Sequence, residues 1–341
     1  MRLFAALLTA QGCPARPHDA PALGLATTDD FGNAAVLYDL ALPALRAGLT
    51  QPPAGPRHIP VLTGFLGRGA KSGAVTTLGR GGSDLTATLV GAALGLPEVV
   101  LWKDIDGVQT TDPRVVAAAR RVPSLTFEEA SELSYFGACV LHPLAMVPAA
   151  EAPGGMAVRV MNSYNAGAAG TRITAQRDVA GAPAVTALVL KEQVTLIDVS
   201  STKMFGTFGF LARVFGVFEA QQVSVDMIAS SEVSVSLTLD PARLWERDLI
   251  DDELEALMSD FAGWATASHR RGFAILSLIC ALDRTNDVLA RAFTVLGREG
   301  VRVHMISQGS SKPSISLVIR DADAKRALHA LHDEYFPPAP R

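Results

Sequence analysis

The sequence predicts an α/β protein with a three-layer domain around a mostly parallel sheet, followed by two ferredoxin-like units. Short apolar runs alternate with helical segments in residues 1–175, which is typical of a parallel sheet between layers of helices. The stretch from Asn165 to Pro183 is rich in glycine and alanine and indicates a domain boundary. Beyond this boundary one order of strands and helices occurs twice, which indicates a structural repeat.

The first half is expected to alternate helices and strands. Residues 1–50 have the pattern of helix, loop and helix, and residues 51–57 form a loop rich in proline and glycine. The elements expected after this loop are a strand at 59–65, a helix at 85–95, a strand at 98–102, a helix at 126–139 and a strand at 157–161. Since strands joined through helices usually run parallel, a mostly parallel sheet follows.

The second half contains the repeat. Its first unit consists of a strand at 194–199, a helix at 210–220 and strands at 223–228 and 233–239. The same order returns roughly 80 residues later, with a strand at 274–279, a helix at 287–299, strands at 301–306 and 314–319 and a closing helix at 321–336. Each unit has the βαββ order of a ferredoxin-like fold. A further strand at 184–190 precedes both units.

Composition excludes several classes of function. The chain has 341 residues, of which 49% are hydrophobic, so it can bury large cores. Its formal net charge of −4 gives no electrostatic footprint for nucleic acid. We expect no membrane span, since no apolar run reaches about 18 residues. The three cysteines, Cys13, Cys139 and Cys280, are far apart, which predicts no metal site and a reducing compartment.

The most informative segment is residues 76–88, in which three glycines surround Arg80 just before an apolar helix. Glycines let backbone N–H groups approach a ligand, and a helix start supplies free N–H donors. Arg80 adds a planar cation suited to a carboxylate or a phosphate. Ser83 and Asp84 can cap the helix or bind a substrate. The segment therefore predicts a cradle for a small anion, and the alternative is an ordinary tight turn with an N-cap.

Two more polar segments follow. Residues 99–114 begin as a buried strand and continue with three aspartates, a lysine and an arginine, at a strand end where ligands of α/β sheets collect. For Asp106 and Asp112 the alternative is a solvated turn. Residues 136–143 close the helix that begins near Phe127, and His142 is expected to be a helix-end residue. The glutamates at 128, 129 and 132 are expected on a solvated helix face.

These three segments, in this order, resemble the aspartate kinases of the amino acid kinase superfamily, above all the plant-type, lysine-sensitive monofunctional form. The two repeated units resemble tandem ACT domains, which bind small amino acids. Further matching stretches are residues 61–67, 158–165, 204–215 and 229–236. The resemblance implies a catalytic domain at 1–175 and a regulatory region at 184–341. There the first ACT unit (about 193–265) is inserted in the second (about 184–191 plus 270–341).

The resemblance also implies that part of the catalytic domain is missing. Related sequences begin with a Lys-Phe-Gly-Gly-Thr/Ser strand and turn, and later have a Ser-x-Gly-Glu motif. Neither occurs here. We therefore expect either a fragment of a longer gene product or a natural short form. Two functions remain open: an aspartate kinase, whose activity in this chain alone is uncertain, and a non-catalytic, amino-acid-binding regulatory chain.

The reaction implied by the resemblance is the ATP-dependent phosphorylation of L-aspartate to 4-phospho-L-aspartate, the first step toward lysine, threonine and methionine. ATP with Mg²⁺ would be the co-substrate, and no tightly bound cofactor is expected. The catalytic residues implied are Arg80, Ser83 and Asp84, which also bind the substrate together with Phe65. No Gly-x-x-x-x-Gly-Lys-Ser/Thr motif occurs, which disfavours P-loop chemistry.

For the nucleotide the resemblance implies five residues: Lys103, Asp104, Gln109, Arg114 and Cys139. Gln109 and Cys139 depart from the residues usual in the family, and Cys139 has the alternative of a small buried hydrophobic residue. Asp104 has the alternative of a solvated turn residue.

For the regulatory half the resemblance implies a lysine site, with S-adenosylmethionine as a second effector and a homodimer formed through the ACT units. A helix N-terminus suits the ligand carboxylate, and Asp226 and Glu232 suit its ammonium groups. The implied effector residues are Met204, Thr207, Gly209, Phe210, Leu211, Ser224, Val225, Asp226, Ser230, Ser231 and Glu232. The alternative for residues 230–232 is an ordinary turn. The plant-type resemblance implies a chloroplast protein, and otherwise a cytoplasmic one.

Overall fold

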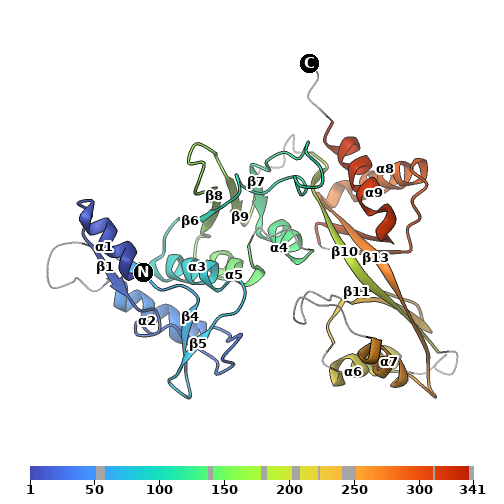
Figure 1. Cartoon of the computed structure of the whole chain (residues 1–341), viewed down its shortest axis with the longest axis horizontal. Helices are drawn as coiled ribbons and strands as arrows, with labels where there is room; N and C mark the ends of the chain where they lie inside the picture. Colours follow the sequence, from blue (N-terminus) through green and yellow to red (C-terminus); the bar gives the residue numbers. More distant parts are fainter. Residues whose placement is uncertain are drawn as a thin grey trace. The chain divides into compact units, whose positions relative to one another are not determined.

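A computed structural model describes residues 1–50, 58–136, 141–177, 183–201, 208–221, 223–239, 251–309 and 312–337. The chain divides into two compact units (Figure 1). The first contains most of residues 1–177, and the second contains most of residues 183–337 together with the segment 109–120. In the described ranges, no helix has the length and apolar character needed to cross a membrane.

The first unit begins with two helices and two small sheets. The helices are expected from the sequence, but β1, β2 and the β4–β5 hairpin are not. β1 pairs in parallel with β3, and β4 pairs in parallel with β2 and antiparallel with β5. The bounds are α1 (Arg2–Ala10), β1 (Ala15–His18), β2 (Ala26–Thr27), α2 (Tyr38–Thr50), β3 (Ile59–Leu62), β4 (Leu66–Gly69) and β5 (Val75–Thr77). The loop expected at 51–57 lies outside the described residues.

The rest of the first unit forms a four-stranded sheet in the order β6-β8-β9-β7, in which only the β8–β9 pair is antiparallel. The sequence did not predict α5, β7 or β9. The helix expected at 126–139 is shorter in the structure: α4 ends at Tyr135 and Phe136 is in a turn. Residues 137–140 lie outside the described residues. The bounds are α3 (Gly82–Leu94), β6 (Glu98–Lys103), β7 (Ser124–Thr126), α4 (Phe127–Tyr135), α5 (Pro143–Glu151), β8 (Ala157–Asn162) and β9 (Thr171–Thr174).

The second unit is built on one six-stranded antiparallel sheet in the order β11-β12-β10-β13-β15-β14. Its strands are β10 (Val185–Ser200), β11 (Val225–Ser230), β12 (Ser234–Leu239), β13 (Thr266–Cys280), β14 (Met305–Gln308) and β15 (Ser314–Arg320). Its helices are α6 (Phe210–Ala220), α7 (Asp251–Ser259), a 3₁₀ turn η3 (Leu282–Arg284), α8 (Thr285–Arg298) and α9 (Asp321–Tyr335). The helices and sheets of the two units together confirm the predicted α/β class.

The two repeated units share two long strands, β10 and β13, which pair with each other along almost their whole length. The separate strands expected at 184–190 and 194–199 are one strand, β10, with a register shift between Lys191 and Val194 and a positive φ of 62° at Gln193. The first half of β10 belongs with β13, β15 and β14, and its second half belongs with β13, β12 and β11.

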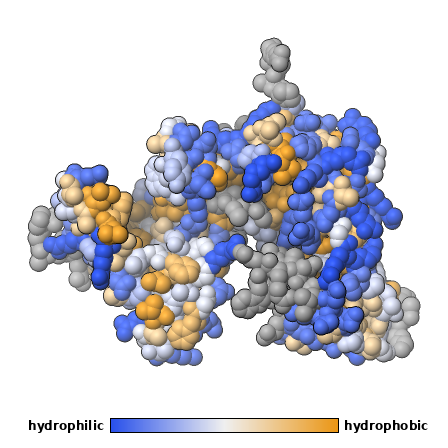
Figure 2. Space-filling model, in the orientation of Figure 1, coloured by the Kyte–Doolittle hydropathy of each residue, from blue (hydrophilic) through white to orange (hydrophobic). Residues whose placement is uncertain are grey.

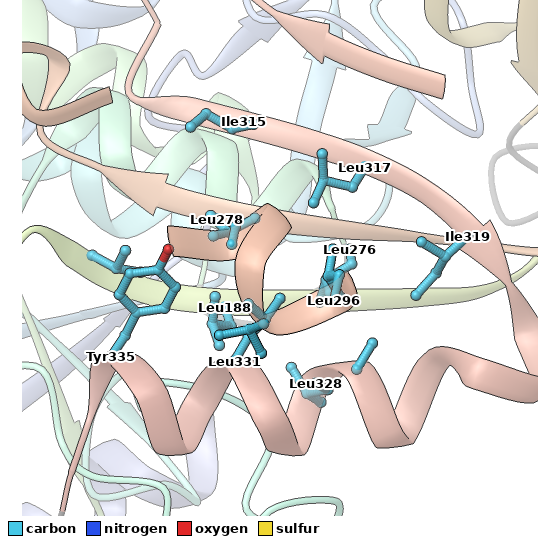
Figure 3. Close-up of a cluster of buried hydrophobic side chains, with 14 of the residues drawn as sticks. Leu188, Leu276, Leu278, Leu296, Ile315, Leu317, Ile319, Leu328, Leu331 and Tyr335 are labelled. Atoms are coloured by element: carbon cyan, nitrogen blue, oxygen red, sulfur yellow. The ribbon is translucent and has the colours of Figure 1, made fainter. Parts of the chain in front are cut away.

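Each half of the sheet has its own core. One core joins α8 and α9 to β10, β13 and β15 through side chains such as Leu188, Leu276, Leu317 and Leu328 (Figure 3). The other joins α6 and α7 to β12, with Phe218 and Phe261 among its fully buried residues. Apolar residues at helical and strand spacing fill both cores, which is why the sequence pattern predicts most of these elements. The sequence did not predict α7.

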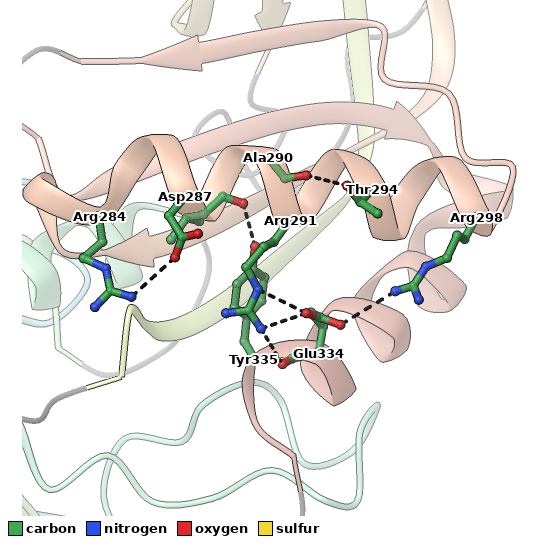
Figure 4. A network of polar contacts seen from close by, with 9 residues as sticks. Arg284, Asp287, Ala290, Arg291, Thr294, Arg298, Glu334 and Tyr335 are labelled. Atoms are coloured by element: carbon green, nitrogen blue, oxygen red, sulfur yellow. Dashed lines mark hydrogen bonds and ion pairs between the residues drawn. The ribbon is translucent and has the colours of Figure 1, made fainter.

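Polar contacts hold α8 against α9 at the surface of the first of these cores (Figure 4). Arg291 Nη2 lies 2.7 Å from Glu334 Oε1, and the hydroxyl of Tyr335 donates to the carbonyl of Val288 at 2.6 Å. In the first unit, α1 exposes the apolar side chains of Leu3, Phe4 and Leu7. Figure 2 shows hydrophobic surface in orange where Figure 1 places this helix.

Candidate functional site

The glycine-rich turn that the sequence singles out lies directly before α3. Gly79 and Gly81 have φ values of 72° and 74°, in the left-handed region that favours glycine. A Cβ on Gly81 would overlap the Cβ of His142, and a Cβ on Gly82 would lie 2.7 Å from that of Leu78. Conformation therefore favours glycine at 79 and 81, and close packing requires it at 81 and 82. Arg80, between Gly79 and Gly81, is exposed.

Phe65 lies beside this turn. Its φ is 73°, its N–H donates to the hydroxyl of Thr86 at 3.1 Å, and its carbonyl accepts from the N–H of Leu78 at 3.0 Å. Phe65 is 39% exposed. A Cβ on the neighbouring Gly64 would lie 3.2 Å from the Oγ of Ser83. The structure therefore brings the predicted substrate residues Phe65 and Ser83 to one place.

The most direct contact among the predicted residues is an ion pair between α3 and β6. Lys103 Nζ donates to Asp84 Oδ2 at 2.6 Å, and the two side chains are 28% and 15% exposed. Asp84 was predicted on the substrate side and Lys103 on the nucleotide side, so this pair joins the two predicted half-sites. Partial burial strengthens the attraction because water screens it less.

The loop after β6 is fastened to the loop after β8. The carbonyl of Lys103 accepts from the N–H and the hydroxyl of Ser163, at 2.8 and 2.9 Å. Asp106 Oδ1 accepts from the amides of Asn162 and Asn165, at 2.8 and 3.0 Å. Asp106 therefore holds the two loops together through hydrogen bonds. From the sequence, Asp106 had been assigned no role and had only the alternative of a solvated turn. The two asparagines that bind Asp106 belong to the stretch 158–165, which was matched to the family from the sequence without being assigned a role.

Of the remaining predicted nucleotide residues, Asp104 directly follows Lys103, whereas Gln109 and Arg114 lie further along the chain. Asp104 is exposed on the loop after β6. Arg114 grips Asp112 through two nitrogens, Nε at 3.0 Å from Oδ1 and Nη2 at 2.7 Å from Oδ2, and this arginine holds the pKa of Asp112 below its usual range. Gln109 and Arg114 both belong to the segment 109–120, which packs with the second unit. Cys139 lies outside the described residues.

Two expectations for the region of α4 and α5 need comment. His142 is a helix-end residue, but at the start of α5, where its Nδ1 accepts from the N–H of Leu144 at 3.3 Å. Glu129 was expected on a solvated face, and this is wrong: it is 4% exposed and lies 2.5 Å from Arg177. The bond from the N–H of Thr126 to Glu129 Oε2, at 2.9 Å, fixes it at the first turn of α4.

In the regulatory unit, Gly209 caps the N-terminus of α6 with a φ of 87°. Phe210 is 5% exposed and packs against Trp264 in the core, whereas Leu211 is 39% exposed. The predicted residues Met204 and Thr207 lie outside the described residues.

Asp226 is buried and already paired. Its Oδ2 accepts from Lys191 Nζ at 2.7 Å, with side-chain exposures of 0% for Asp226 and 11% for Lys191. Its other oxygen, Oδ1, is buried and has no hydrogen-bond partner among the residues that the structure describes. Ser224 and Val225 precede it on the same stretch of chain and are half-buried.

Ser230, Ser231 and Glu232 lie in the exposed β11–β12 hairpin. There the Oγ atoms of Ser231 and Ser234 are 2.6 Å apart, which is the geometry of a tight turn. Across the described ranges, no group of three or more His, Cys, Asp or Glu side chains is placed to hold a metal ion.

Comparison with known proteins adds two family matches. Residues 1–162 match the amino acid kinase family, and residues 282–335 match an ACT domain. The chain is 50% identical over 335 residues to Arabidopsis thaliana aspartokinase 1, chloroplastic, covering 98% of this chain and 58% of the relative. It is 36% identical over 321 residues to the lysine-sensitive aspartokinase 3 of Escherichia coli, covering 91% of this chain and 67% of the relative.

The structure is similar to that of E. coli aspartokinase III in complex with aspartate and ADP, with a TM-score of 0.81 and 35% identity over 98% of this chain and 73% of that one. The complex of the same enzyme with lysine and aspartate gives a TM-score of 0.77 at 32% identity, over 98% and 72%. The chain spans somewhat less than two thirds of the length of the Arabidopsis relatives it matches.

Proposed function

Because this chain belongs to the aspartokinase family, we propose that it serves the ATP-dependent phosphorylation of L-aspartate to 4-phospho-L-aspartate. The observation that carries this proposal is the ion pair between Asp84 and Lys103, at 2.6 Å, beside the glycine-rich turn. One residue of the pair comes from the predicted aspartate site and the other from the predicted nucleotide site. Similarity to an aspartokinase solved with aspartate and ADP supports the same conclusion.

The chemistry requires positioning more than proton transfer. The nucleophile is the β-carboxylate of aspartate, whose usual pKa of about 4 leaves it ionised without a general base. It attacks the γ-phosphorus of ATP, the bond to the bridging oxygen of ADP breaks, and an acyl phosphate forms. The protein must hold two anions in line and stabilise the charge on the transferring group.

On the substrate side, we assign the aspartate α-carboxylate to Arg80 and the backbone N–H groups at the start of α3. A guanidinium matches a carboxylate in two parallel hydrogen bonds, and a helix N-terminus favours negative charge. Ser83 would hydrogen-bond the substrate, and the exposed ring of Phe65 would form a wall. Asp84 suits the substrate ammonium. Its ion pair with Lys103 holds this carboxylate in place until the substrate arrives.

On the nucleotide side, we assign Lys103, Asp104, Gln109, Arg114 and Cys139 to ATP. Mg²⁺ would enter with ATP, held chiefly by phosphate oxygens and water, as is usual for this ion. Its contribution is to neutralise the phosphate charge during transfer.

For regulation, we propose that lysine binds the first ACT unit and inhibits the reaction, with S-adenosylmethionine as a further effector and a homodimer as the working form. The buried carboxylate of Asp226, with one oxygen unpaired among the described residues, supports an ammonium site there. The Arabidopsis relatives are named chloroplastic, which supports the same location for this protein.

The test begins with calorimetric titration of L-aspartate and of ADP with Mg²⁺ into the 341-residue chain. In parallel, the chain is joined to the part of Arabidopsis aspartokinase 1 that its match leaves uncovered, and acyl phosphate formed from ATP and aspartate is trapped with hydroxylamine. We expect aspartate-dependent hydroxamate in the joined protein. Arg80→Ala should weaken aspartate binding roughly 10- to 100-fold, the loss of one charged hydrogen-bonding group.

The matched control is Arg46→Ala, which removes an exposed arginine of α2 and should leave aspartate binding unchanged. Binding of lysine without any aspartate-dependent phosphoryl transfer in the joined protein would reject the kinase and leave a regulatory chain. Equal aspartate affinity in the parent and Arg80→Ala proteins would reject the assignment of Arg80.

A further inference from the structure

The segment 109–120 leaves the first unit and packs with the second. Its base is closed within the first unit, where the N–H of Val122 donates to the carbonyl of Val108 at 2.7 Å. Thr171 fastens this closure from β9: its hydroxyl donates to the carbonyl of Val122 at 2.6 Å and accepts from the N–H of Val108 at 2.8 Å. The segment is therefore a closed loop with a rigid base in the predicted catalytic unit.

Thr110 anchors the segment to the second unit. Its carbonyl accepts from the N–H of Leu188 on β10 at 2.7 Å, and its Oγ1 lies 3.0 Å from Nε2 of His332 on α9. The same hydroxyl accepts from the N–H of Arg120 at 3.0 Å, which ties the two ends of the segment together. Thr110 is 5% exposed and His332 is completely buried. These buried hydrogen bonds hold Thr110 firmly in place, because breaking one would leave a buried polar atom without a partner.

Two further contacts extend this anchor. Val116 is 2% exposed and belongs to the hydrophobic core that α8 and α9 form over β10, β13 and β15. Arg120 Nη2 donates to the carbonyl of Phe336, just beyond the end of α9, at 2.9 Å. The residues on either side of the segment 109–120 therefore belong to the first unit, whereas Val116 in its middle lies in a core of the second.

His332 is suited to this contact. Burial lowers the pKa of its imidazole, which favours the neutral form, and Nε2 of the ring shares a hydrogen bond with the hydroxyl of Thr110. Its ring packs against Phe336, with centroids 4.9 Å apart. Its Nδ1 is buried and meets no partner in the described part of the chain, so Thr110 supplies the one hydrogen bond that the described structure gives this ring.

Strand β10 connects this anchor to the proposed effector site. Leu188, which holds the carbonyl of Thr110, lies on the same strand as Lys191, whose ammonium pairs with the buried Asp226. A ligand ammonium that competes for Asp226 would displace Lys191, only three residues along β10 from Leu188. A rigid strand can carry such a displacement from Lys191 to Leu188, and from there to Thr110 through the hydrogen bond between them.

We propose that the segment 109–120 is the connection through which an amino acid bound at the regulatory unit changes nucleotide binding, with His332 as a positioning residue that fixes Thr110. This inference rests on the proposed function, since Gln109 and Arg114 of this segment are assigned there to ATP. Allostery of this kind is a coupling free energy, so lysine and nucleotide should change each other's affinity by the same factor.

The experiment measures that factor in the 341-residue chain. ADP with Mg²⁺ is titrated with and without saturating lysine, and lysine is titrated separately. In the parent we expect lysine to weaken ADP binding about 5-fold or more. His332→Leu and Thr110→Val should each bring the ratio of the two ADP dissociation constants to within about twofold of one. Their lysine affinity should stay at the parent value.

Two variants separate positioning from mere structure. His332→Gln keeps a hydrogen-bonding group near Nε2 and should restore most of the coupling. His329→Leu, which changes an exposed histidine of the same helix, should leave the coupling as in the parent. Hydrogen exchange gives a second readout: lysine should change the exchange of amides in residues 109–120 of the parent and leave it unchanged in Thr110→Val.

Parental coupling in both His332→Leu and Thr110→Val would overturn the inference while leaving the proposed function intact. If His332→Leu does not fold, Thr110→Val decides the matter alone. If the parent binds neither lysine nor ADP, the proposed function fails, and the inference fails with it.

Discussion

At the scale of single residues, two carboxylates predicted to hold a ligand ammonium are both paired with an ammonium of the chain itself. Asp84 holds Lys103 at 2.6 Å, and Asp226 holds Lys191 at 2.7 Å. The second pair is the more buried, so neither charge is well solvated, and removal of one partner should be costly. In both proposed sites, a lysine of the chain binds the carboxylate that a ligand ammonium could bind instead.

Lys191→Met tests this exchange. It leaves the carboxylate of Asp226 buried without its cation, so the variant should be less stable than the parent by about 3 to 5 kcal/mol. Saturating lysine should stabilise the variant more than it stabilises the parent, because the ligand supplies the missing ammonium. Urea unfolding of both proteins, with and without lysine, measures the two increments.

The control is Lys325→Met, which changes an exposed lysine of α9 and should behave like the parent. Equal lysine increments in the parent and Lys191→Met proteins would show that Asp226 does not receive the ligand ammonium.

At the scale of elements, helix α3 has a glycine in the left-handed region at each end, Gly81 before its first turn and Gly95 after its last. The two differ in their surroundings: a Cβ on Gly81 would overlap His142, whereas a Cβ on Gly95 would meet no atom of the described chain within 4 Å. This makes a matched pair for separating backbone strain from close packing.

Gly95→Ala should cost about 1 kcal/mol, because only the left-handed conformation opposes it. Gly81→Ala should cost about 1 to 3 kcal/mol more, since α5 must also move away from the turn. Urea unfolding measures both. Aspartate titration should show a loss of affinity in Gly81→Ala alone. Similar unfolding free energies for the two variants would contradict the close approach of α5 to the turn.

The sheet of the first unit contains an acid-sensitive contact. Glu98 on β6 accepts from Arg159 at 2.9 Å and from Arg172 at 3.3 Å, and its side chain is 28% exposed. The hydrogen bond from Arg159 is the main cause that lowers the pKa of Glu98 below its ordinary 4.5. A carboxyl with a lowered pKa contributes stability that is present above its unfolded pKa and is lost as the pH falls through its folded pKa.

We therefore expect the parent to lose more unfolding free energy than Glu98→Gln when the pH falls from 6 to about 3. The difference should be modest, because the pair is partly exposed. Urea unfolding at several pH values measures it. Parallel pH profiles for the two proteins would show that these arginines do not favour the ionised form.

At the scale of the whole molecule, the chain consists of two compact units, each with buried apolar residues of its own. Such proteins often depart from two-state unfolding. Calorimetry should therefore show two transitions, and lysine should raise chiefly the one that belongs to residues 183–337, through ligand linkage. If lysine also raises the melting temperature of the first unit, Thr110→Val should make that increase smaller. A single transition that lysine moves as a whole would contradict independent melting of the units.

Much of the fold could be predicted because it depends on local pattern. The apolar spacing of α6, α8 and α9 and of the strands between them predicts one buried face for each element. Short strands such as β2 and β7, of two and three residues, carry too little pattern to be recognised. The same is true of α5, which contains an internal proline.

The sequence by itself determined the α/β class, the repeat in the second half and the glycine-rich turn with Arg80, because these features depend on residues adjacent in the chain. Only the tertiary structure decided that β10 and β13 run through both repeats, that Lys103 pairs with Asp84 and Lys191 with Asp226, and that the segment 109–120 meets His332. These contacts join residues far apart in the chain. Neither residue of such a contact carries a local signal for its partner, so packing of the folded chain alone selects it.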